Sequence, residues 1–554
     1  MKGKPAQLRA IAIQTIVVAL IAGSSYAIGP ITLYVDAGSG CTSGCGSQSA
    51  PYPAIQAAID DANAKIGGGL ATEATIVVAP GTYAEHLLVY PSVHVECDSP
   101  STVTINASGF SRAAVVFGSL GTGRTATDFS IDGCTITGGS GEVRSTLVGG
   151  GGVFIFGNPV ISNNVIRDNV VSGPRDDYVG GGIYVSDGDP VISGNIIMRN
   201  VANPPPLGGQ DNSFGLGGGI YVLGQFSGVS THPQIVDNLF LDNFAGGQVG
   251  KGGAIRIDGN PGALVSRNTL IGNRASHSGG GIEAYNDLTI SDNLIYGNSA
   301  LLFGGGIDSL QSSIQITNNT IVGNGLTATA APSGYSYANY GGGLHLRALI
   351  PQVPPEVSLT NNLLSGNTIH QSGAGAGIYT LYTYPVTTHN DSHGNLKLPG
   401  AGSHMEGDFS DFDFLTMTGN ISQDPDYANA PLFNDVTVAA GTATTVKVLD
   451  ASRYTVNQKI EYNDDGVLRT VTALNTSTDA LTFTPPLPAF SKAFKLVADW
   501  NVASTANEDF HLPAGSPAID AGDGGAVSAL DLDRNPRISD GDINGSSIVD
   551  MGAY

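Results

Sequence analysis

The stretch that decides the fold runs from Gly180 to Asn200 and reads GGGIYVSDGDPVISGNIIMRN. Three glycines precede an alternating strand-like run, a turn and a second run follow, and two asparagines stand five residues apart at its end. Seven similar units begin at Gly150, Gly217, Gly252, Gly279, Gly304, Gly341 and Gly375. Their paired asparagines are Asn164/Asn169, Asn195/Asn200, Asn238/Asn243, Asn268/Asn273, Asn293/Asn298, Asn319/Asn324, Asn362/Asn367 and Asn390/Asn395. Such self-similarity predicts a repeat architecture.

Each unit predicts one coil of an all-β parallel β-helix. Apolar and polar residues alternate with period two, and no helical periodicity separates the short runs. The first asparagines of successive pairs lie 25 to 43 residues apart, which fits one coil with inserted loops. A single coil cannot bury its apolar face, so coils must stack, with asparagine ladders at the bends and glycine at the tight turns. Cys134 occupies the asparagine position of an earlier coil.

Composition agrees with a folded, strand-rich chain. Of 554 residues, 77 are Gly and 29 are Pro, which excludes a mainly helical protein, whereas 41% hydrophobic residues exclude disorder. The 24 Lys and Arg against 47 Asp and Glu give a net charge of −23. No basic stripe is present, so nucleic acid is excluded as a partner.

Residues 1–27 predict a signal peptide for export. Lys2, Lys4 and Arg9 precede an apolar stretch from 10 to 22, and a small-residue cleavage site ends at Ala27. Cleavage leaves 21 positive and 47 negative side chains, a net charge of −26. We expect a secreted or cell-surface protein without a transmembrane span in the mature chain; an uncleaved anchor is the alternative.

The four cysteines fit an oxidising compartment. Cys41 and Cys45 enclose a tight turn, which predicts a disulfide. Cys97 and Cys134 lie in strand-like segments of neighbouring coils, and either a second disulfide or two buried thiols fits their positions.

Several segments resemble a known family. YVDAGSG (34–40), YPAIQAAIDDA (52–62) and IVVAPGTY (76–83), followed by the repeats, resemble secreted right-handed parallel β-helix proteins of the pectin-lyase-like superfamily. SPAIDAGD (516–523), LDLDRNPR (530–537) and VDMGAY (549–554) resemble the C-terminal segment of choice-of-anchor Q surface proteins. The resemblance implies the fold more than any activity, since the superfamily holds lyases, hydrolases, epimerases and adhesins. Its members often continue beyond the equivalent of Tyr554, so we expect an anchoring segment to be missing here.

These observations divide the chain into four parts. After the signal peptide, residues 31–434 predict the β-helix, with a short helix at 55–64 that caps its open end. Residues 435–506 break the repeat and predict a small inserted β-module with strands at 444–449, 458–462, 467–471 and 480–483. It either binds glycan or acts as a spacer. Residues 507–554 form the end of the β-helix or an anchor-type segment.

The glycine triplets fix which side chains of the following strand face outward. The first outward row carries Phe154, Tyr184 and Tyr221 and then changes to Arg256, Glu283, Asp308 and His345 before Tyr379. We expect these four ionisable residues in one exposed row, with adjacent coils roughly 4.8 Å apart. Asp258, Tyr285 and Arg347 belong to the second outward row.

This row is the candidate catalytic site. Repulsion between Glu283 and Asp308 would raise the pKa of one carboxyl so that it could serve as an acid. His345 would assist proton transfer, and Arg256 would hold developing charge. Substrate would be bound by Tyr184, Tyr221, Asp258, Tyr285, Arg347 and Tyr379. The alternative is a cross-strand ladder of opposite charges that only adds stability.

The tail offers a candidate calcium site. Asp531 and Asp533 alternate, as do Asp540, Asp542 and Asn544, a spacing that presents oxygen ligands to Ca²⁺. A solvated acidic turn is the alternative, and no other cofactor is predicted.

Together these features predict an exported protein that binds extracellular polysaccharide and cleaves it as a glycosidase or lyase. The high negative charge favours a neutral or weakly charged glycan. The rival hypothesis is a non-catalytic adhesin or stalk.

Overall fold

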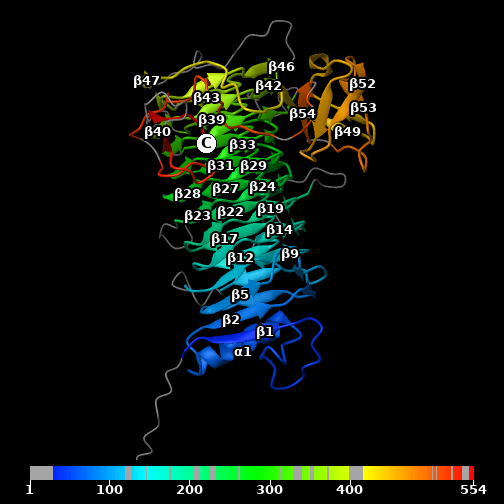
Figure 1. The fold of residues 1–554 in the computed structure, drawn as a ribbon, viewed down its shortest axis with the longest axis vertical. Coiled ribbons are helices and arrows are strands. Elements are labelled where there is room, and N and C mark those ends of the chain that lie inside the picture. Colours follow the sequence, from blue (N-terminus) through cyan, green and yellow to red (C-terminus); the bar gives the residue numbers. More distant parts are fainter. Residues whose placement is uncertain are drawn as a thin grey trace, which may run out of the picture.

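In the computed structural model the chain forms a tall column of stacked β-coils (Figure 1). The chain runs along the column from the blue N-terminal end, and an orange β-module lies beside its upper part. Within the described part of the chain, no helix is long and apolar enough to cross a membrane. The structure describes residues 29–554 apart from 119–126, 145, 174–176, 205–212, 225–231, 260–261, 286, 312, 329–339, 350–354, 371–372, 399–415, 493–494, 502, 504, 507, 526–527 and 540–547.

Four parallel sheets form the walls of the column, and each coil from β12 to β46 contributes one strand to each in turn. Sheet I contains β4 (Leu87–Val89), β7 (Val115–Phe117), β12 (Val153–Phe156), β17 (Ile183–Asp187), β22 (Ile220–Leu223), β27 (Ile255–Asp258), β31 (Ile282–Tyr285), β35 (Ile307–Leu310), β39 (Leu344–Arg347) and β43 (Ile378–Leu381).

Sheet II follows sheet I within each coil. It contains β1 (Ile31–Val35), β2 (Ala74–Val78), β5 (Val93–Cys97), β8 (Ser130–Asp132), β13 (Val160–Ser162), β18 (Val191–Ser193), β23 (Gln234–Val236), β28 (Ala263–Ser266), β32 (Leu288–Ser291), β36 (Ile314–Thr317), β40 (Val357–Thr360), β44 (Val386–Thr388) and β47 (Thr416–Thr418).

Sheets III and IV complete the coil. Sheet III contains β3 (Gly81–Tyr83), β6 (Val103–Asn106), β9 (Thr135–Thr137), β14 (Val165–Arg167), β19 (Ile196–Met198), β24 (Leu239–Leu241), β29 (Thr269–Ile271), β33 (Leu294–Tyr296), β37 (Thr320–Val322), β41 (Leu363–Ser365) and β45 (Asp391–His393). Sheet IV contains β15 (Val170–Val171), β20 (Val201–Ala202), β25 (Phe244–Ala245), β30 (Arg274–Ala275), β34 (Ser299–Ala300), β38 (Gly325–Leu326), β42 (Thr368–His370) and β46 (Leu396–Leu398).

A further ladder, which we call the side ladder, runs beside sheet I at the residues that precede each glycine turn. It begins with β10 (Glu142–Arg144), β11 (Leu147–Gly149), β16 (Asp177–Val179), β21 (Phe214–Leu216) and β26 (Val249–Lys251). It continues as single parallel bridges that join Lys251, Ser278, Phe303, Tyr340 and Ala374 in order.

Asparagine ladders hold the bends on both sides of sheet III. The side-chain oxygen of Asn319 accepts from the backbone N–H and the side-chain amide of Asn293, at 3.0 and 2.9 Å. The amide of Asn319 in turn donates to Asn362 in the next coil at 3.0 Å. The residue before each ladder asparagine has a positive φ, as at Asp292 (59°), which turns the chain sharply.

The interior of the column is filled by apolar side chains that stack from one coil to the next. Ile255, Ile282 and Ile307 stack in register inside sheet I and are fully buried. The same inward alternation continues in the other sheets, so one hydrophobic cluster runs from Leu33 to Ile378. This continuous core is what a single coil could not provide.

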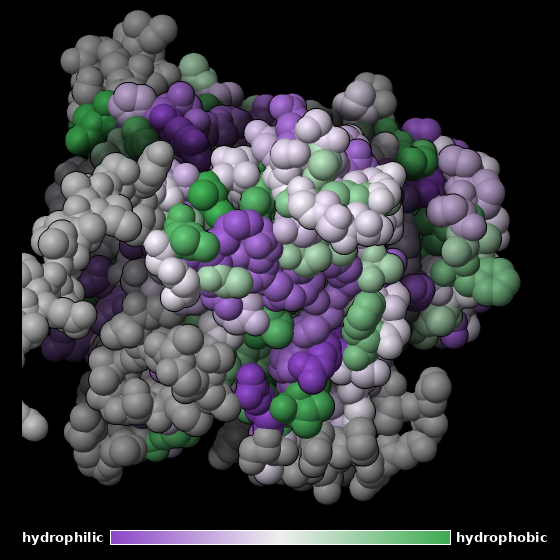
Figure 2. Space-filling model, turned by 90° about the horizontal axis from the view of Figure 1, so that it is seen from below, coloured by the Kyte–Doolittle hydropathy of each residue, from purple (hydrophilic) through white to green (hydrophobic). Residues whose placement is uncertain are grey.

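The N-terminal end is capped by α1 (Ile55–Gly67), the helix that the sequence predicts at 55–64. Ile55, Ala58 and Ile59 are buried against the first coil. The Glu85 carboxylate accepts from the backbone N–H groups of Ile55 and Gln56 at 2.9 and 2.8 Å. Seen from this end, hydrophilic and neutral residues cover much of the surface and hydrophobic ones are scattered among them (Figure 2).

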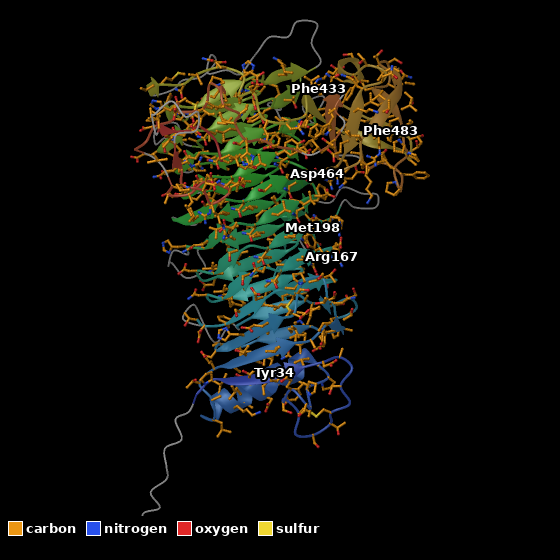
Figure 3. All side chains as sticks on the ribbon, viewed as in Figure 1. Tyr34, Arg167, Met198, Phe433, Asp464 and Phe483 are labelled. Carbon is orange, nitrogen blue, oxygen red and sulfur yellow. A yellow bond between two sulfur atoms is a disulfide. The ribbon has the colours of Figure 1, made fainter. Side chains whose placement is uncertain are left out.

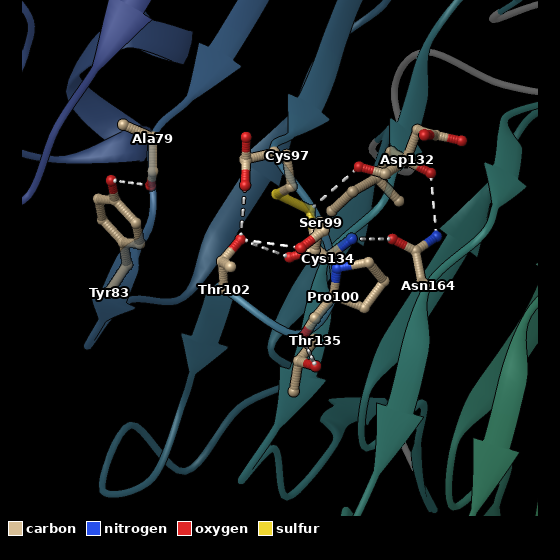
Figure 4. The surroundings of a disulfide bond; sticks show 12 residues. Ala79, Tyr83, Cys97, Ser99, Pro100, Thr102, Asp132, Cys134, Thr135 and Asn164 are labelled. Atoms are coloured by element: carbon tan, nitrogen blue, oxygen red, sulfur yellow. Dashed lines mark hydrogen bonds between the residues drawn. A yellow bond between two sulfur atoms is a disulfide. The ribbon is translucent and has the colours of Figure 1, made fainter.

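The predicted Cys41–Cys45 disulfide forms, and of the two alternatives for Cys97 and Cys134 the structure has the disulfide. Cys97 ends β5, and Cys134 follows β8 in the neighbouring coil, with their Cα atoms 5.3 Å apart (Figure 4). The Cys134 N–H donates to Asn164 Oδ1 at 3.0 Å, so Cys134 does occupy a ladder position. A cross-link over 37 residues stabilises the first coils by roughly 4 kcal/mol in the loop-entropy model.

The inserted module is an antiparallel sheet with its own core, built around Val446, Ile460 and Val471. Figure 3 places Phe483 within it and Asp464 at the boundary with the column. Its strands are β48 (Phe433–Val436), β49 (Ala439–Thr442), β50 (Thr445–Lys447), β51 (Lys459–Tyr462), β52 (Arg469–Asn475), β53 (Ala480–Thr484) and β54 (Leu496–Asn501), with a 3₁₀ turn at Ala451–Arg453.

The module and the tail both pack against sheet III and its bends. The Lys495 ammonium pairs with the Asp242 carboxylate of the column. The tail, with β55 (Ile538–Ser539) and β56 (Ile548–Val549), inserts Arg537, which pairs with the fully buried Asp292 at 2.7 Å. Arg537 also donates to the Gly552 carbonyl at 2.7 Å. These buried pairs fix both segments on the column.

Three carboxylates meet at the boundary between module and column. Glu461, Asp464 and Glu508 have oxygens within 4.8 Å of one another. The Tyr296 hydroxyl of β33 donates to Glu508 at 3.3 Å. Burial, with Glu461 and Asp464 beside it, raises the pKa of Glu508 from 4.5 to about 7.

We expect the module to dock less firmly as pH rises from about 5 to 8. A carboxyl with a raised folded-state pKa stabilises the fold below its unfolded-state value, and that stabilisation is lost as pH rises through about 7. Glu508→Gln keeps the neutral form, so the variant should show a flatter pH profile of the thermal midpoint. Asp426→Asn, at an exposed position, serves as the control. A wild-type slope unchanged in Glu508→Gln would contradict the assignment.

Candidate functional site

The predicted row of ionisable residues is present in the predicted register. Arg256 pairs with Glu283, Glu283 with Asp308, and Asp308 with His345 on consecutive strands β27, β31, β35 and β39. The next strand, β43, adds Tyr379 beside His345. The four side chains therefore form one line along the outer face of sheet I.

The row is buried, which corrects the expectation that it is exposed. Glu283, Asp308 and His345 have exposed fractions of 1%, 0% and 1%. The cause is the side ladder, whose members Lys251 and Phe303 lie directly over the row.

The first glycine of each triplet makes this close cover possible. Gly279 has φ +63°, and a Cβ there would lie 2.8 Å from the Cβ of Glu283. At Gly341 a Cβ would lie 2.6 Å from the Cβ of His345. Only glycine allows the chain to turn so tightly over the row that it follows.

Glu283 is the centre of a buried ion network. Its Oε1 accepts from Arg256 Nη1 at 2.8 Å and from Lys251 Nζ at 3.0 Å. Ser278 Oγ donates to its other oxygen. Arg256 also pairs with Asp258, at 2.8 Å between Nη2 and Oδ1. Charge is balanced when His345 is neutral, because Lys251, Arg256 and Arg347 offset Glu283, Asp258 and Asp308.

The pKa values of Glu283 and Asp308 are both lowered, which contradicts the prediction that one of these carboxyls serves as an acid. Burial alone would raise the pKa of Glu283, but Lys251 and Arg256 outweigh it and lower that pKa. Burial would likewise raise the pKa of Asp308, and Arg347 and His345 lower it. Repulsion between the two carboxyls does not dominate because a cation faces each of them. Both are carboxylates at neutral pH.

His345 forms a dyad with Asp308. Its Nδ1 lies 2.6 Å from Asp308 Oδ1, and the ring stacks on Phe303 with 5.1 Å between centroids. Burial lowers the pKa of His345, so the ring is neutral and its Nδ1–H donates to Asp308. Within the described part of the chain, Nε2 has no hydrogen-bond partner.

Three predicted sugar-stacking tyrosines have other partners. Tyr184 and Tyr221 stack on each other at 5.5 Å in a second apolar core with Phe154, and are 2% and 5% exposed. Tyr379 stacks on Tyr340 at 4.3 Å. The side ladder covers this half of the row as well, so Tyr184 and Tyr221 offer no free face.

The second outward row, by contrast, opens onto solvent. A hollow of about 330 Å³, which we call the sheet I hollow, is lined by Leu223, Gly224, Arg256, Asp258, Gly259, Tyr285 and Leu310. Asp258 is fixed at its floor, because the Tyr221 hydroxyl donates to Asp258 Oδ2 at 2.9 Å and Arg256 Nε donates to the same oxygen at 3.0 Å. Arg347 lies further along, 3.5 Å from Asp308.

Lys251 and Ser278, which hold Glu283, are not among the site residues that the sequence predicts. Each directly precedes the first glycine of a unit, as do Phe303 and Tyr340. This shared position could have identified them from the sequence, because residues next to a recurrent tight turn must lie close to the strand that follows.

The tail residues do not assemble a calcium site among the described residues. Asp531 Oδ1 accepts from the Asn535 N–H at 2.7 Å, and Asp533 Oδ2 lies 2.5 Å from His511 Nε2. Neither belongs to a group of three possible ligands in the part of the chain that was described. Asp540, Asp542 and Asn544 lie outside the described residues, so the calcium prediction stays a prediction.

Comparison with known proteins supports the fold. The model of the family described as right handed beta helix region matches residues 93–261 and 219–348. With the parallel sheets above, this match shows an all-β, right-handed parallel β-helix. A comparison with curated proteins finds none that matches.

Several solved structures are similar at low identity. The PL6 family alginate lyase AlyGC is 12% identical, over 59% of this chain and 50% of that one, with a TM-score of 0.31. This chain thus spans about half the length of the lyase. The tailspike gp49 of Acinetobacter baumannii bacteriophage Fri1, a capsular polysaccharide depolymerase, is 10% identical over 87% and 85%, with a TM-score of 0.27. A tailspike of E. coli bacteriophage HK620, in complex with a pentasaccharide, is 12% identical over 82% and 92%, with a TM-score of 0.28.

Proposed function

We propose that this protein binds a neutral or weakly charged extracellular polysaccharide across the outer face of sheet I. The observation that carries the proposal is the sheet I hollow, which combines an open concave surface with fixed polar groups and an aromatic ring. Such a combination is typical of ligand sites. The binding residues are Asp258, Tyr285 and Arg256, with Arg347 further along the face.

The polar groups of the hollow are held ready for hydroxyl ligands. Asp258 keeps its position through Tyr221 and Arg256, so little side-chain freedom is lost when a sugar hydroxyl donates to it. A hydrogen bond to a carboxylate is stronger than one between neutral groups. Tyr285 adds an apolar face for a sugar ring. Glu283, buried below, acts as a positioning residue that holds Arg256.

The negative charge of the protein favours a neutral or weakly charged glycan as the ligand. A net charge of −23 repels polyanions over the whole surface, and Asp258 adds a carboxylate inside the hollow. A neutral chain meets neither obstacle.

Tyr285→Ala is expected to weaken polysaccharide binding about tenfold, because truncation of an aromatic contact typically costs more than 1 kcal/mol. The measurement is affinity electrophoresis in gels that contain dextran, glucomannan or galactomannan, with alginate as an anionic comparison. Phe490→Ala, an exposed ring on the module, is the control.

At least one neutral polysaccharide should retard the wild type, and Phe490→Ala should follow it. If none of the gels retards the wild type, the protein does not bind these glycans, and the adhesin or stalk hypothesis takes its place. Retardation by alginate alone would show that the protein prefers an anionic glycan, contrary to the expectation from its net charge.

Cleavage of the bound chain is our second proposal. The His345 dyad has the groups for it, but His345 is 1% exposed beneath Phe303, so turnover would require the side ladder to move off the row. A neutral imidazole oriented by Asp308, with Nε2 lacking a partner among the described residues, is the form in which histidine accepts a proton. Glu283 and Asp308 would then support the site as carboxylates.

His345→Gln is expected to abolish any product formation, by a factor of at least about 10², while binding changes less than about twofold because the residue does not line the hollow. New reducing ends report hydrolysis, and unsaturated ends report elimination. Equal turnover by His345→Gln and wild type would remove His345 from the mechanism.

Export and calcium belong to the proposal as well. Residues 1–27 support a secreted or cell-surface location. The alternating acidic residues from Asp531 to Asn544 support a calcium-bound tail turn.

A further inference from the structure

A larger hollow lies on the neighbouring sheet. It has a volume of about 610 Å³ and is formed by the outer faces of β36, β40 and β44 and by the turns that lead into them. Its polar lining is Ser313, Gln315, Glu356 and Ser358, and Tyr384 and Pro355 are among its apolar lining. We call it the sheet II hollow. Nothing in the proposed function uses it.

The two hollows are separated by a single turn of the chain. Leu310, the last residue of β35, lines the sheet I hollow, and Ser313, just before β36, lines the sheet II hollow. Three residues span at most about 11 Å. The turn is tied to its neighbours: the Ser313 N–H donates to Asp287 Oδ1 at 3.0 Å, and the Leu349 N–H donates to Gln311 Oε1 at 2.7 Å.

The lining of the sheet II hollow suits a neutral, hydroxyl-rich ligand. Gln315 pairs in register with Ser358, so an amide and a hydroxyl repeat at the coil spacing of roughly 4.8 Å. Among the described residues that line the hollow there is no Lys, Arg or His, and Glu356 is its one carboxylate. A polyanion would find no counter-charge here, whereas sugar hydroxyls would find both donors and acceptors.

The aromatic ring of this hollow is held on a restricted backbone. Tyr384 precedes Pro385, and a residue before proline is limited to extended conformations. Its side chain is 43% exposed, so an apolar face is available without rearrangement. A contact on a pre-organised segment loses less entropy on binding.

We infer that one polysaccharide chain passes from the sheet I hollow past Leu310 and Ser313 into the sheet II hollow, where Tyr384 and Gln315 bind its distal sugars. This inference rests on the proposed function and extends it to a bent, two-part site. Recognition therefore depends on chain length, because only a chain long enough to round the corner reaches Tyr384.

Oligosaccharides of increasing length, prepared from the neutral polysaccharide that retards the wild type, test the inference by calorimetry. The affinity of the wild type should rise once the chain spans both hollows. Tyr384→Ala should remove that rise, a loss of about tenfold for long chains, and leave short chains unchanged. Tyr285→Ala should weaken chains of every length.

Tyr382→Ala is the matched control, since this ring is 49% exposed on the same turn and does not line the hollow. It should behave as wild type at all lengths. If Tyr384→Ala binds long chains as the wild type does, the inference is overturned while the proposed function stands. If Tyr384→Ala and Tyr382→Ala weaken binding equally, the turn has been perturbed and the direct contact is refuted. If no polysaccharide binds the wild type, both proposals fall.

Discussion

Glu283→Gln is expected to lower the free energy of unfolding by about 3–5 kcal/mol, although the two side chains have the same shape. In the wild type one buried carboxylate compensates both Arg256 and Lys251. With the amide, the largely buried cations of Arg256 and Lys251 have only the Asp258 carboxylate nearby. A loss of this size is a large fraction of the stability of a typical domain. Urea unfolding, followed by circular dichroism, gives the measurement.

A second substitution separates charge from packing. Lys251→Met in the Glu283→Gln background removes one uncompensated cation and should recover part of the loss. Asp168→Asn, which breaks an exposed pair with Arg199, should cost less than about 1 kcal/mol. Equal destabilisation by Glu283→Gln and Asp168→Asn would show that the buried network contributes no more than a surface pair.

Asn319→Ala is expected to cost about 2–4 kcal/mol, because several buried groups lose their partners together. Asn319 is fully buried, and its amide donates to the carbonyls of Ile290 and Thr317 at 2.9 and 3.0 Å. Its oxygen accepts from the backbone and side chain of Asn293. No water can replace these bonds inside the column.

Asn319→Asp should be more damaging than Asn319→Ala. A carboxylate would face the two carbonyl oxygens to which the amide now donates, and it would be charged in a buried position. Asn420→Ala is the control, since this residue lies near the end of the same ladder and is half-buried, so water can solvate the freed groups. If aspartate were tolerated as well as alanine, the direction of the ladder's hydrogen bonds would be wrong.

The β-helix and the alignment of the ionisable row could be predicted from the sequence because both depend on the repeated units. The glycine triplets gave the register, and that register correctly placed Arg256, Glu283, Asp308 and His345 on adjacent strands. Burial of the row could not be predicted from strand alternation alone. It depends on the side ladder, whose members share the position before each glycine turn but vary in type from Lys251 to Phe303.

How the segments without a repeat pack against the column could not be predicted from the sequence. The module strands predicted at 444–449 and 458–462 form as β50 and β51, but the docking of Lys495 on Asp242 joins residues 253 positions apart. The sheet II hollow arises where turns of different length meet, and Tyr384 lies on one of these turns, outside the repeated strands. Only the three-dimensional structure brings such residues together.

The coils stack at a constant spacing, whatever the number of residues in each. Coils of 25 and of 43 residues pair in the same register, because their extra residues leave the column as loops. The length of the column therefore depends on the number of coils, at roughly 4.8 Å for each. A duplication of residues 150–179, a coil between the capped base and the sheet I hollow, would lengthen the column by one coil and keep both asparagine ladders aligned. The distance between the capped base and the sheet I hollow can thus change without any change in the chemistry of either.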